Sequence, residues 1–288
     1  MQPQTERYLD LARLGANQWW RYALGALVIV AFWLGLGSVP YLLLAGADLG
    51  GPLAVFVAIN LNVFMMLAGL AITVKRIHHR TLLSLITPDA RIDWRRAARG
   101  AAAWLVIAAA ATAIEHALYP DRYFLSFNPG TFLPFLGLVL VLTPIQSATE
   151  ELVFRGYLMQ GLGLLTRRPA VVAVLSSLAF TAPHMLGPDV YEQGALIMVV
   201  NYFVIGMLLA TVTLRDGRLE LAIGLHAANN VFLALIANYE GSPLMTDAVF
   251  TAREFDPVYS LVTLVIGALV FHWWIFGGRH KLTATSDR

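Results

Sequence analysis

The feature that most constrains this chain is the recurrence of apolar stretches of about 20 residues, the length a helix needs to cross the hydrocarbon core of a bilayer. Hydrophobic residues make up 58% of the 288 positions and charged residues only 13%, about half the charged share of an ordinary soluble domain. We therefore predict an all-α, polytopic integral membrane bundle. It should have about eight transmembrane helices, at residues 21–44, 53–74, 99–118, 131–149, 169–186, 193–214, 219–237 and 258–277.

The sequence offers no natural point at which to divide the chain. It contains no internal repeat, low-complexity tract or long linker, so residues 1–288 are expected to form a single integral membrane domain. The first 20 residues are polar and lack the short apolar core and small-residue cleavage site of a signal peptide. The first span is therefore expected to stay as a membrane anchor. Cysteine is absent, which excludes disulfides and thiolate chemistry.

Basic residues are distributed unevenly among the loops. Eighteen of the 20 lysines and arginines lie before the first span and in every second connection after it, and the alternate connections hold only Arg122 and Arg253. Because basic loops stay in the cytoplasm, both termini are expected there. Seven of the basic residues lie within 75–99, a segment that we interpret as an anchor near anionic lipid headgroups. We expect no nucleic acid partner. The excess of Arg over Lys, with abundant Ala, Leu and Gly, favours a bacterial plasma membrane.

Three polar clusters interrupt the apolar pattern, and the first is "EELVFR" after the span at 131–149. Glu151 and Arg155 are four residues apart with the acid first, which is the favourable order for an ion pair on one face of a helix. Glu150 projects about 100° away from Glu151. We therefore expect one glutamate to be structural and the other to be free to act.

The other two clusters lie in the spans at 169–186 and 219–237. "FTAPH" places Phe180 and His184 four residues apart, and "HAANN" places His226 and Asn230 on one helical face. A single such residue is more often a packing residue or an interhelical hydrogen bond. An ionisable residue inside a span costs about 2.5–3.5 kcal/mol on insertion scales, so three clusters on three helices indicate a functional site.

Together the three motifs resemble, in order, the Glu-Glu-x-x-x-Arg, Phe-x-x-x-His and His-x-x-x-Asn motifs of the CAAX protease and bacteriocin-processing family (CPBP, also called ABI) of intramembrane proteases. The resemblance covers residues 144 to 237, and the motif-bearing core is expected at about 131–237. Eukaryotic members of this family remove the last three residues of prenylated CAAX proteins. For this chain the resemblance implies an intramembrane endopeptidase that acts on a membrane-associated or lipidated protein or peptide.

The resemblance also implies roles for individual residues. Glu150 would activate water with help from His184, while His226 and Asn230 would stabilise the oxyanion. The supporting residues would be Glu151, Arg155 and Phe180. The family is often described as metalloproteases, and related members have been described as glutamate-dependent without a catalytic metal.

The chemistry of these residues agrees with hydrolysis and leaves the use of a metal open. A carboxylate and an imidazole can act as base, and an imidazole and an amide can donate hydrogen bonds to an oxyanion. Alternatively, the two-histidine, one-carboxylate set of Glu150, His184 and His226 is of the kind that holds a catalytic zinc ion. The His-Glu-x-x-His signature of zinc proteases is absent. A serine nucleophile is disfavoured because no G-x-S-x-G context surrounds the nearby serines, Ser147, Ser176 and Ser177.

The depths of the motifs in the membrane present a difficulty. At about 1.5 Å per residue, straight helices place Glu150 near the cytoplasmic end of its span but His184 roughly 22 Å deep. We therefore expect the segment 150–168 to lie within the membrane and to line a wet cavity open to the cytoplasm. Glu115 and His116 match no family motif and are expected to form a hydrogen bond outside the site.

Two other classes of function compete with the protease. In a proton-coupled transporter the buried Glu, Arg and His would form a proton relay, but the chain lacks the paired halves of many carriers. In a bacteriocin-immunity or membrane scaffold protein the same residues would only hold the bundle together.

Overall fold

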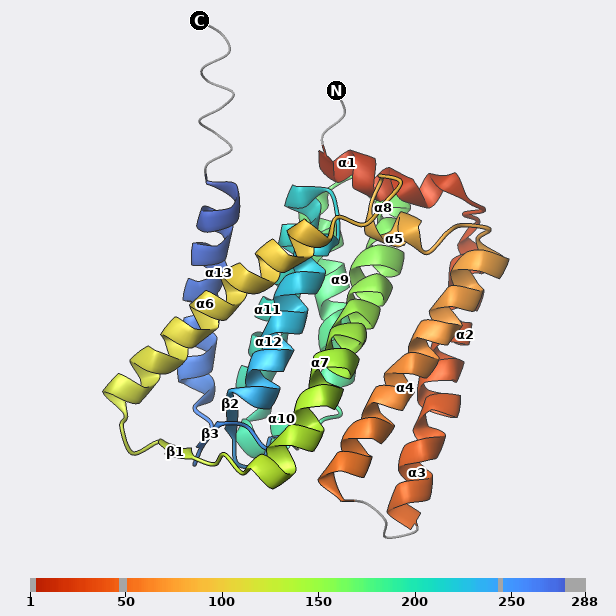
Figure 1. The fold of residues 1–288 in the computed structure, drawn as a ribbon. Coiled ribbons are helices and arrows are strands. Elements are labelled where there is room, and N and C mark those ends of the chain that lie inside the picture. Colours follow the sequence, from red (N-terminus) through yellow and green to blue (C-terminus); the bar gives the residue numbers. More distant parts are fainter. Residues whose placement is uncertain (1–3, 47–50, 243–245, 278–288) are drawn as a thin grey trace, which may run out of the picture.

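The computed structural model describes residues 4–46, 51–242 and 246–277. The helices form a bundle, with α1 and the end of α13 at one end and a small sheet at the other (Figure 1). We call these the terminal end and the sheet end. The helices of the first half are α1 (Gln4–Leu9), α2 (Trp19–Val30), α3 (Val39–Gly46), α4 (Pro52–Ile72), α5 (Leu83–Ile86) and α6 (Trp94–Leu118). Those that follow are α7 (Pro129–Glu151), α8 (Met159–Leu165), α9 (Pro169–His184), α10 (Pro188–Gln193), α11 (Ala195–Asp216), α12 (Glu220–Leu235) and α13 (Pro257–Phe276).

The prediction of a polytopic helical membrane protein is confirmed. In the described residues six stretches are long and apolar enough to cross a membrane: Trp19–Leu44, Pro52–Ile77, Trp94–Leu118, Pro129–Leu165, Ala195–Asp216 and Pro257–Phe276. The two other predicted spans are the apolar helices α9 and α12, of 16 residues each. At about 24 Å they are shorter than a hydrocarbon core of about 30 Å. These two helices carry His184, His226 and Asn230.

The predicted span at 131–149 is too short. Helix α7 continues through a π-helical segment, Leu152–Leu158, into α8, so that Pro129–Leu165 is one helical stretch of 37 residues. The residues from Leu152 to Leu165 are mostly apolar, the charge of Arg155 is compensated inside the bundle, and the buried Gln160 is hydrogen-bonded to Arg80 and Ser84. The helix ends at Thr166, whose backbone is extended.

This long helix removes the difficulty over depth. Glu150 lies 15 residues before the end of α8, and His184 lies 15 residues after the start of α9. Both distances correspond to about 22 Å of helix. Only residues 166–168 connect α8 to α9, so the two helices run back along each other and the two side chains come to similar depths. The segment 150–168 is thus mostly helix within the bundle, and its opening to the cytoplasm stays a prediction.

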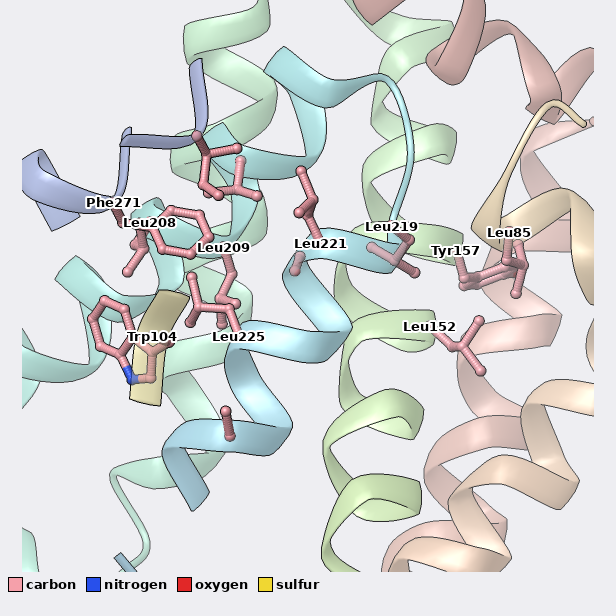
Figure 2. Close-up of a cluster of buried hydrophobic side chains, with 14 of the residues drawn as sticks. Leu85, Trp104, Leu152, Tyr157, Leu208, Leu209, Leu219, Leu221, Leu225 and Phe271 are labelled. Atoms are coloured by element: carbon pink, nitrogen blue, oxygen red, sulfur yellow. The ribbon is translucent and has the colours of Figure 1, made fainter. Parts of the chain in front are cut away.

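Helix α12 packs closely on α6 because glycines line the crossing. A Cβ atom built on Gly224 would lie 1.9 Å from the carbonyl oxygen of Ala97, and one on Gly100 would lie 2.4 Å from that of Leu221. Around this crossing lies the largest cluster of buried apolar side chains. Figure 2 shows Trp104 and Phe271 in this cluster beside leucines of α11 and α12. The close approach fixes where α12 presents His226.

The all-α prediction misses a small three-stranded sheet at the sheet end. Its strands are β1 (Tyr123–Leu125), β2 (Ala237–Tyr239) and β3 (Phe250–Ala252), in the order β1-β3-β2. Strand β3 runs antiparallel to β1 and parallel to β2. The sheet therefore joins the loop after α6 to two segments of the connection between α12 and α13.

Candidate active site

A fully buried ion pair lies at the centre of the motif residues. The Nη1 atom of Arg155 donates to Oε1 of Glu151 at 2.8 Å, and neither side chain is exposed. The Nδ1 atom of His226 lies 2.8 Å from the same carboxylate oxygen. A buried charge is tolerated when it is paired and hydrogen-bonded. The ion pair predicted from the four-residue spacing is confirmed, and His226 of α12 joins it.

Two further contacts hold the guanidinium of Arg155. Its Nη2 atom donates to the carbonyl oxygen of Gly206 in α11 at 3.1 Å, and its Cζ atom lies 4.3 Å from the centre of the Phe180 ring in α9. A cation over an aromatic face is stabilised further where water is excluded. Arg155 thus connects three helices, and the motif phenylalanine has a definite structural place.

The backbone around Arg155 is also fixed from outside the motifs. Arg155 lies in the π-helical segment Leu152–Leu158, a widened turn that is rare and often occurs at functional sites. The hydroxyl of Tyr8 in α1, whose side chain is buried, donates to the carbonyl oxygens of Arg155 at 3.1 Å and of Leu85 at 2.7 Å. The N-terminal helix α1 therefore contacts the backbone of the site and helps to hold it in position. No motif in the sequence pointed to this contact.

Glu150 has a different environment from Glu151. Its side chain is 14% exposed, and its Oε2 atom lies 3.8 Å from Nε2 of His226. Its Oε1 atom accepts a long hydrogen bond of 3.4 Å from Gln146. Since a carboxylate only accepts hydrogen bonds, Glu151 fixes the proton of His226 on Nδ1 and directs Nε2 towards Glu150. Glu151 is thus held in the buried ion pair, whereas Glu150 is partly exposed.

His184 adjoins this cluster through Phe180. Its Nδ1 atom lies 2.8 Å from the carbonyl oxygen of Phe180, which can only accept, so the neutral ring carries its lone pair on Nε2. The ring of Phe180 lies 4.6 Å from that of His184 and 6.0 Å from that of His226, measured between ring centres. On the other side, His184 stacks on Tyr202 of α11 at 4.4 Å.

Asn230 is positioned by a relay of amide side chains. Its Nδ2 atom donates to Oγ of Ser147 at 3.3 Å, and its Oδ1 atom accepts from Asn229 at 3.1 Å. Asn229 in turn accepts from the indole nitrogen of Trp104 at 3.0 Å. Ser147 is buried one helical turn before Glu151, so the serine that the sequence disfavoured as a nucleophile has a positioning role that the motifs did not reveal.

The donor atoms do not fit a metal ion in this arrangement. Among the described residues, no three His, Cys, Asp or Glu side chains are grouped so that they could hold a metal ion. The Nδ1 atoms of both motif histidines are hydrogen-bonded, one to Glu151 and one to a backbone carbonyl, so Nε2 is the ring nitrogen that each could offer to an ion. The zinc set of Glu150, His184 and His226 is therefore not assembled here, and zinc binding stays a prediction.

Glu115 and His116 lie apart from the motif cluster. Glu115 accepts from Arg122 and from the hydroxyl of Tyr123, both at 2.8 Å, in the loop that leads into β1. The ring of His116 faces that of Tyr123 with 6.4 Å between centres. The expected hydrogen bond outside the site is confirmed for Glu115.

Comparisons with known proteins support the motif-based interpretation. The model of a family described as type II CAAX prenyl endopeptidase Rce1-like matches residues 129–232, which include every motif residue. The uncharacterized protein YyaK of Bacillus subtilis (strain 168) is 30% identical over 278 residues, which cover 89% of this chain and 91% of YyaK. No solved structure matches the chain. The chain belongs to the CPBP family of Rce1-like type II CAAX prenyl endopeptidases, which are proteases of the membrane.

Proposed function

We propose that this protein is an intramembrane endopeptidase in which Glu150 activates the attacking water molecule. The observation that carries the proposal is the division between two adjacent glutamates. Glu151 is fully buried and committed to Arg155 and His226, whereas Glu150 is partly exposed and has only two long polar contacts. A glutamate that only stabilised the bundle would be expected to be paired and buried like Glu151, whereas Glu150 is partly exposed.

The attacking water has a place between Glu150 and His226. Their facing atoms are 3.8 Å apart, too far for a direct hydrogen bond. A water molecule beside this gap can lie at about 2.8 Å from both atoms. Glu150 removes a proton as the water oxygen attacks the carbonyl carbon of the peptide bond. We assign His184, whose ring orientation is fixed by Phe180 and Tyr202, a second contact to this water.

Asn230 and His226 are the proposed donors to the oxyanion. The Asn230 amide has two N–H groups, and one of them goes to Ser147. We assign the other to the oxyanion that forms when water adds to the peptide carbonyl. In its doubly protonated form His226 donates from Nε2, first to the water oxygen and, once that oxygen has bonded to the carbonyl carbon, to the neighbouring oxyanion. The intermediate then breaks at its C–N bond, and the amine leaves with the proton that Glu150 held, so one water yields a carboxyl and an amino product.

For the substrate we propose a membrane-associated protein or peptide, and for the location a bacterial plasma membrane with both termini in the cytoplasm. The family is the support for a peptide substrate. The orientation is supported by the distribution of basic residues. It also agrees with the position of α1 and the end of α13 at the same end of the bundle (Figure 1).

The scaffold function is the main alternative, and one comparison separates the two. Protein termini are compared by mass spectrometry in membranes of cells that express the wild type, Glu150→Gln or Glu6→Gln at equal levels. Glu6 is an exposed glutamate of α1 and serves as the control. A hydrolase predicts a set of termini that disappears in Glu150→Gln and persists in Glu6→Gln. If the three samples share the same termini, while both variants still rescue a deletion phenotype, the scaffold function replaces the protease.

A further inference from the structure

A cavity of about 290 Å³ lies at the sheet end between α6, α11, α12 and α13. Its apolar lining includes Trp104, Ile107, Met198 and Phe232. The motif residues Glu150, His184, His226 and Asn230 are not part of its lining. An apolar hollow of this size with a few polar groups is typical of a ligand site, and the mechanism proposed above leaves it unused.

The cavity adjoins the catalytic residues through two side chains. Asn229 lines the cavity and donates to Oδ1 of Asn230 at 3.1 Å. Tyr202 also lines it and stacks on His184 at 4.4 Å. A molecule in the cavity therefore lies one residue away from the proposed oxyanion donor and from the histidine that contacts water. This position suits a part of the substrate next to the scissile bond.

Three acidic residues, Glu115, Glu254 and Asp256, line the cavity, and within the described part of the chain its lining includes no Lys, Arg or His. We call the part around the exposed Glu254 the mouth. Arg122 lies beside the mouth, with nitrogen atoms 2.8, 4.0 and 3.3 Å from these three carboxylates. One guanidinium thus serves three carboxylates. The side chain of Glu254 is 77% exposed, so it can pair with a cation that arrives from outside.

Polar side chains in the cavity suit a peptide. A chain must be unwound to be hydrolysed, and every N–H and C=O group that it exposes inside a membrane needs a partner. Asn201 and Ser260 line the cavity. Their hydrogens are bonded within the fold, those of Asn201 to the carbonyl oxygens of Ile197 and Pro257 and that of Ser260 to Asn201, but both side-chain oxygens have a further lone pair that can accept from a peptide N–H group. A purely hydrocarbon ligand would have no use for them.

We propose that this cavity binds an apolar segment of the peptide substrate that carries a basic residue on the sheet-end side. The inference rests on the proposed protease function. The apolar side chains of the segment lie against α6 and α12, its backbone N–H groups donate to the side-chain oxygens of Asn201 and Ser260, and its cationic group pairs with Glu254 at the mouth. The peptide bond after this segment then reaches Asn230 and His184.

The test uses two synthetic apolar peptides that contain photo-leucine and differ only in a terminal lysine or glutamate. The full-length Glu150→Gln protein in lipid nanodiscs is crosslinked to each, so that no peptide is hydrolysed. We expect saturable labelling of α6, α11, α12 and α13, about threefold stronger for the lysine peptide, because a partly exposed ion pair contributes less than about 1 kcal/mol. Adding Glu254→Lys should reverse this preference, and adding Ala108→Trp should fill the cavity and remove the labelling.

Equal labelling by both peptides, or labelling that Ala108→Trp leaves unchanged, would overturn the inference. Glu254→Lys keeps the test valid if the tryptophan variant does not fold, because Glu254 is exposed. The same peptides incubated with the wild type separate this inference from the proposed function. Labelling of the cavity without any cleavage retains the binding site and rejects the protease. Cleavage of both peptides at equal rates without labelling retains the protease and rejects the binding site.

Discussion

Removing one partner of the buried ion pair between Glu151 and Arg155 should destabilise this protein more than removing one partner of an exposed pair. Replacing Arg155 by Met removes the 2.8 Å contact with Glu151, the hydrogen bond to Gly206 and the cation over Phe180. It leaves the Glu151 carboxylate fully buried with only His226 as partner. Breaking a buried pair in this way costs about 3–5 kcal/mol, because one charge stays uncompensated. We expect Arg155→Met to lower the free energy of unfolding by that amount.

A control pair of similar N–O distance but greater exposure tests whether burial determines the effect. Arg167 and Asp10 form a pair at 2.7 Å, but these side chains are 42% and 26% exposed. Exposed pairs contribute about 0–1 kcal/mol, so Arg167→Met should change the free energy of unfolding by no more than that. The assay is reversible unfolding in mixed micelles by titration with dodecyl sulfate, followed by circular dichroism.

The double variant Glu151→Gln/Arg155→Met completes the cycle. Because removing both charges avoids the lone buried carboxylate, its loss should be smaller than the sum of the single losses by about 1–3 kcal/mol. If Arg155→Met and Arg167→Met cost the same, or if the two site substitutions are additive, the argument that burial determines the contribution of this pair is refuted.

Four further predictions concern helix packing, catalysis, metal use and pH. Gly224→Ala should lower the melting temperature of the purified protein, since its Cβ atom would lie 1.9 Å from a backbone oxygen of α6 and overpacking costs about 1–3 kcal/mol. The control is Gly35→Ala, because a Cβ atom built on Gly35 has no neighbouring atom within 4 Å. Asn230→Ala should reduce kcat by about 10²–10³ through the loss of one oxyanion donor, measured as the rate at which the substrate-derived termini appear, with an unchanged melting temperature. If Glu150 takes the proton of the water directly, as proposed, treatment with a chelator should leave that rate unchanged. A loss of activity that zinc alone restores would favour the zinc set of Glu150, His184 and His226. Burial lowers the pKa of His78, which follows the second span. In the unfolded chain this histidine has its ordinary pKa of about 6.5, so below that pH the unfolded chain binds more protons than the folded one. The free energy of unfolding should therefore fall as the pH drops below about 6.5, and His78→Gln should reduce this pH dependence.

Much of the site could be predicted because its signals are local. The four-residue spacing predicted the pair of Glu151 with Arg155, and helical periodicity predicted the shared face of His226 and Asn230. Both patterns depend only on the geometry of one helix. The positions of the apolar spans followed from length and composition in the same way.

The parts that the sequence did not reveal depend on contacts between distant segments. The helix continues past Glu151 because a carbonyl of α11 and a ring of α9 compensate the charge of Arg155. Tyr8 reaches the backbone of Arg155 across 147 positions of the chain. Strand β1 of the small sheet lies more than 100 residues before β2 and β3, and three-residue strands carry too little periodicity to be recognised.

The central claim is that Glu150 is catalytic and Glu151 structural, and paired glutamine substitutions test it most directly. Cleavage and unfolding are measured side by side for Glu150→Gln and Glu151→Gln. We expect Glu150→Gln to abolish the substrate-derived termini and to leave the unfolding midpoint unchanged, whereas Glu151→Gln should destabilise the fold. Termini that persist in Glu150→Gln at the wild-type level would contradict it.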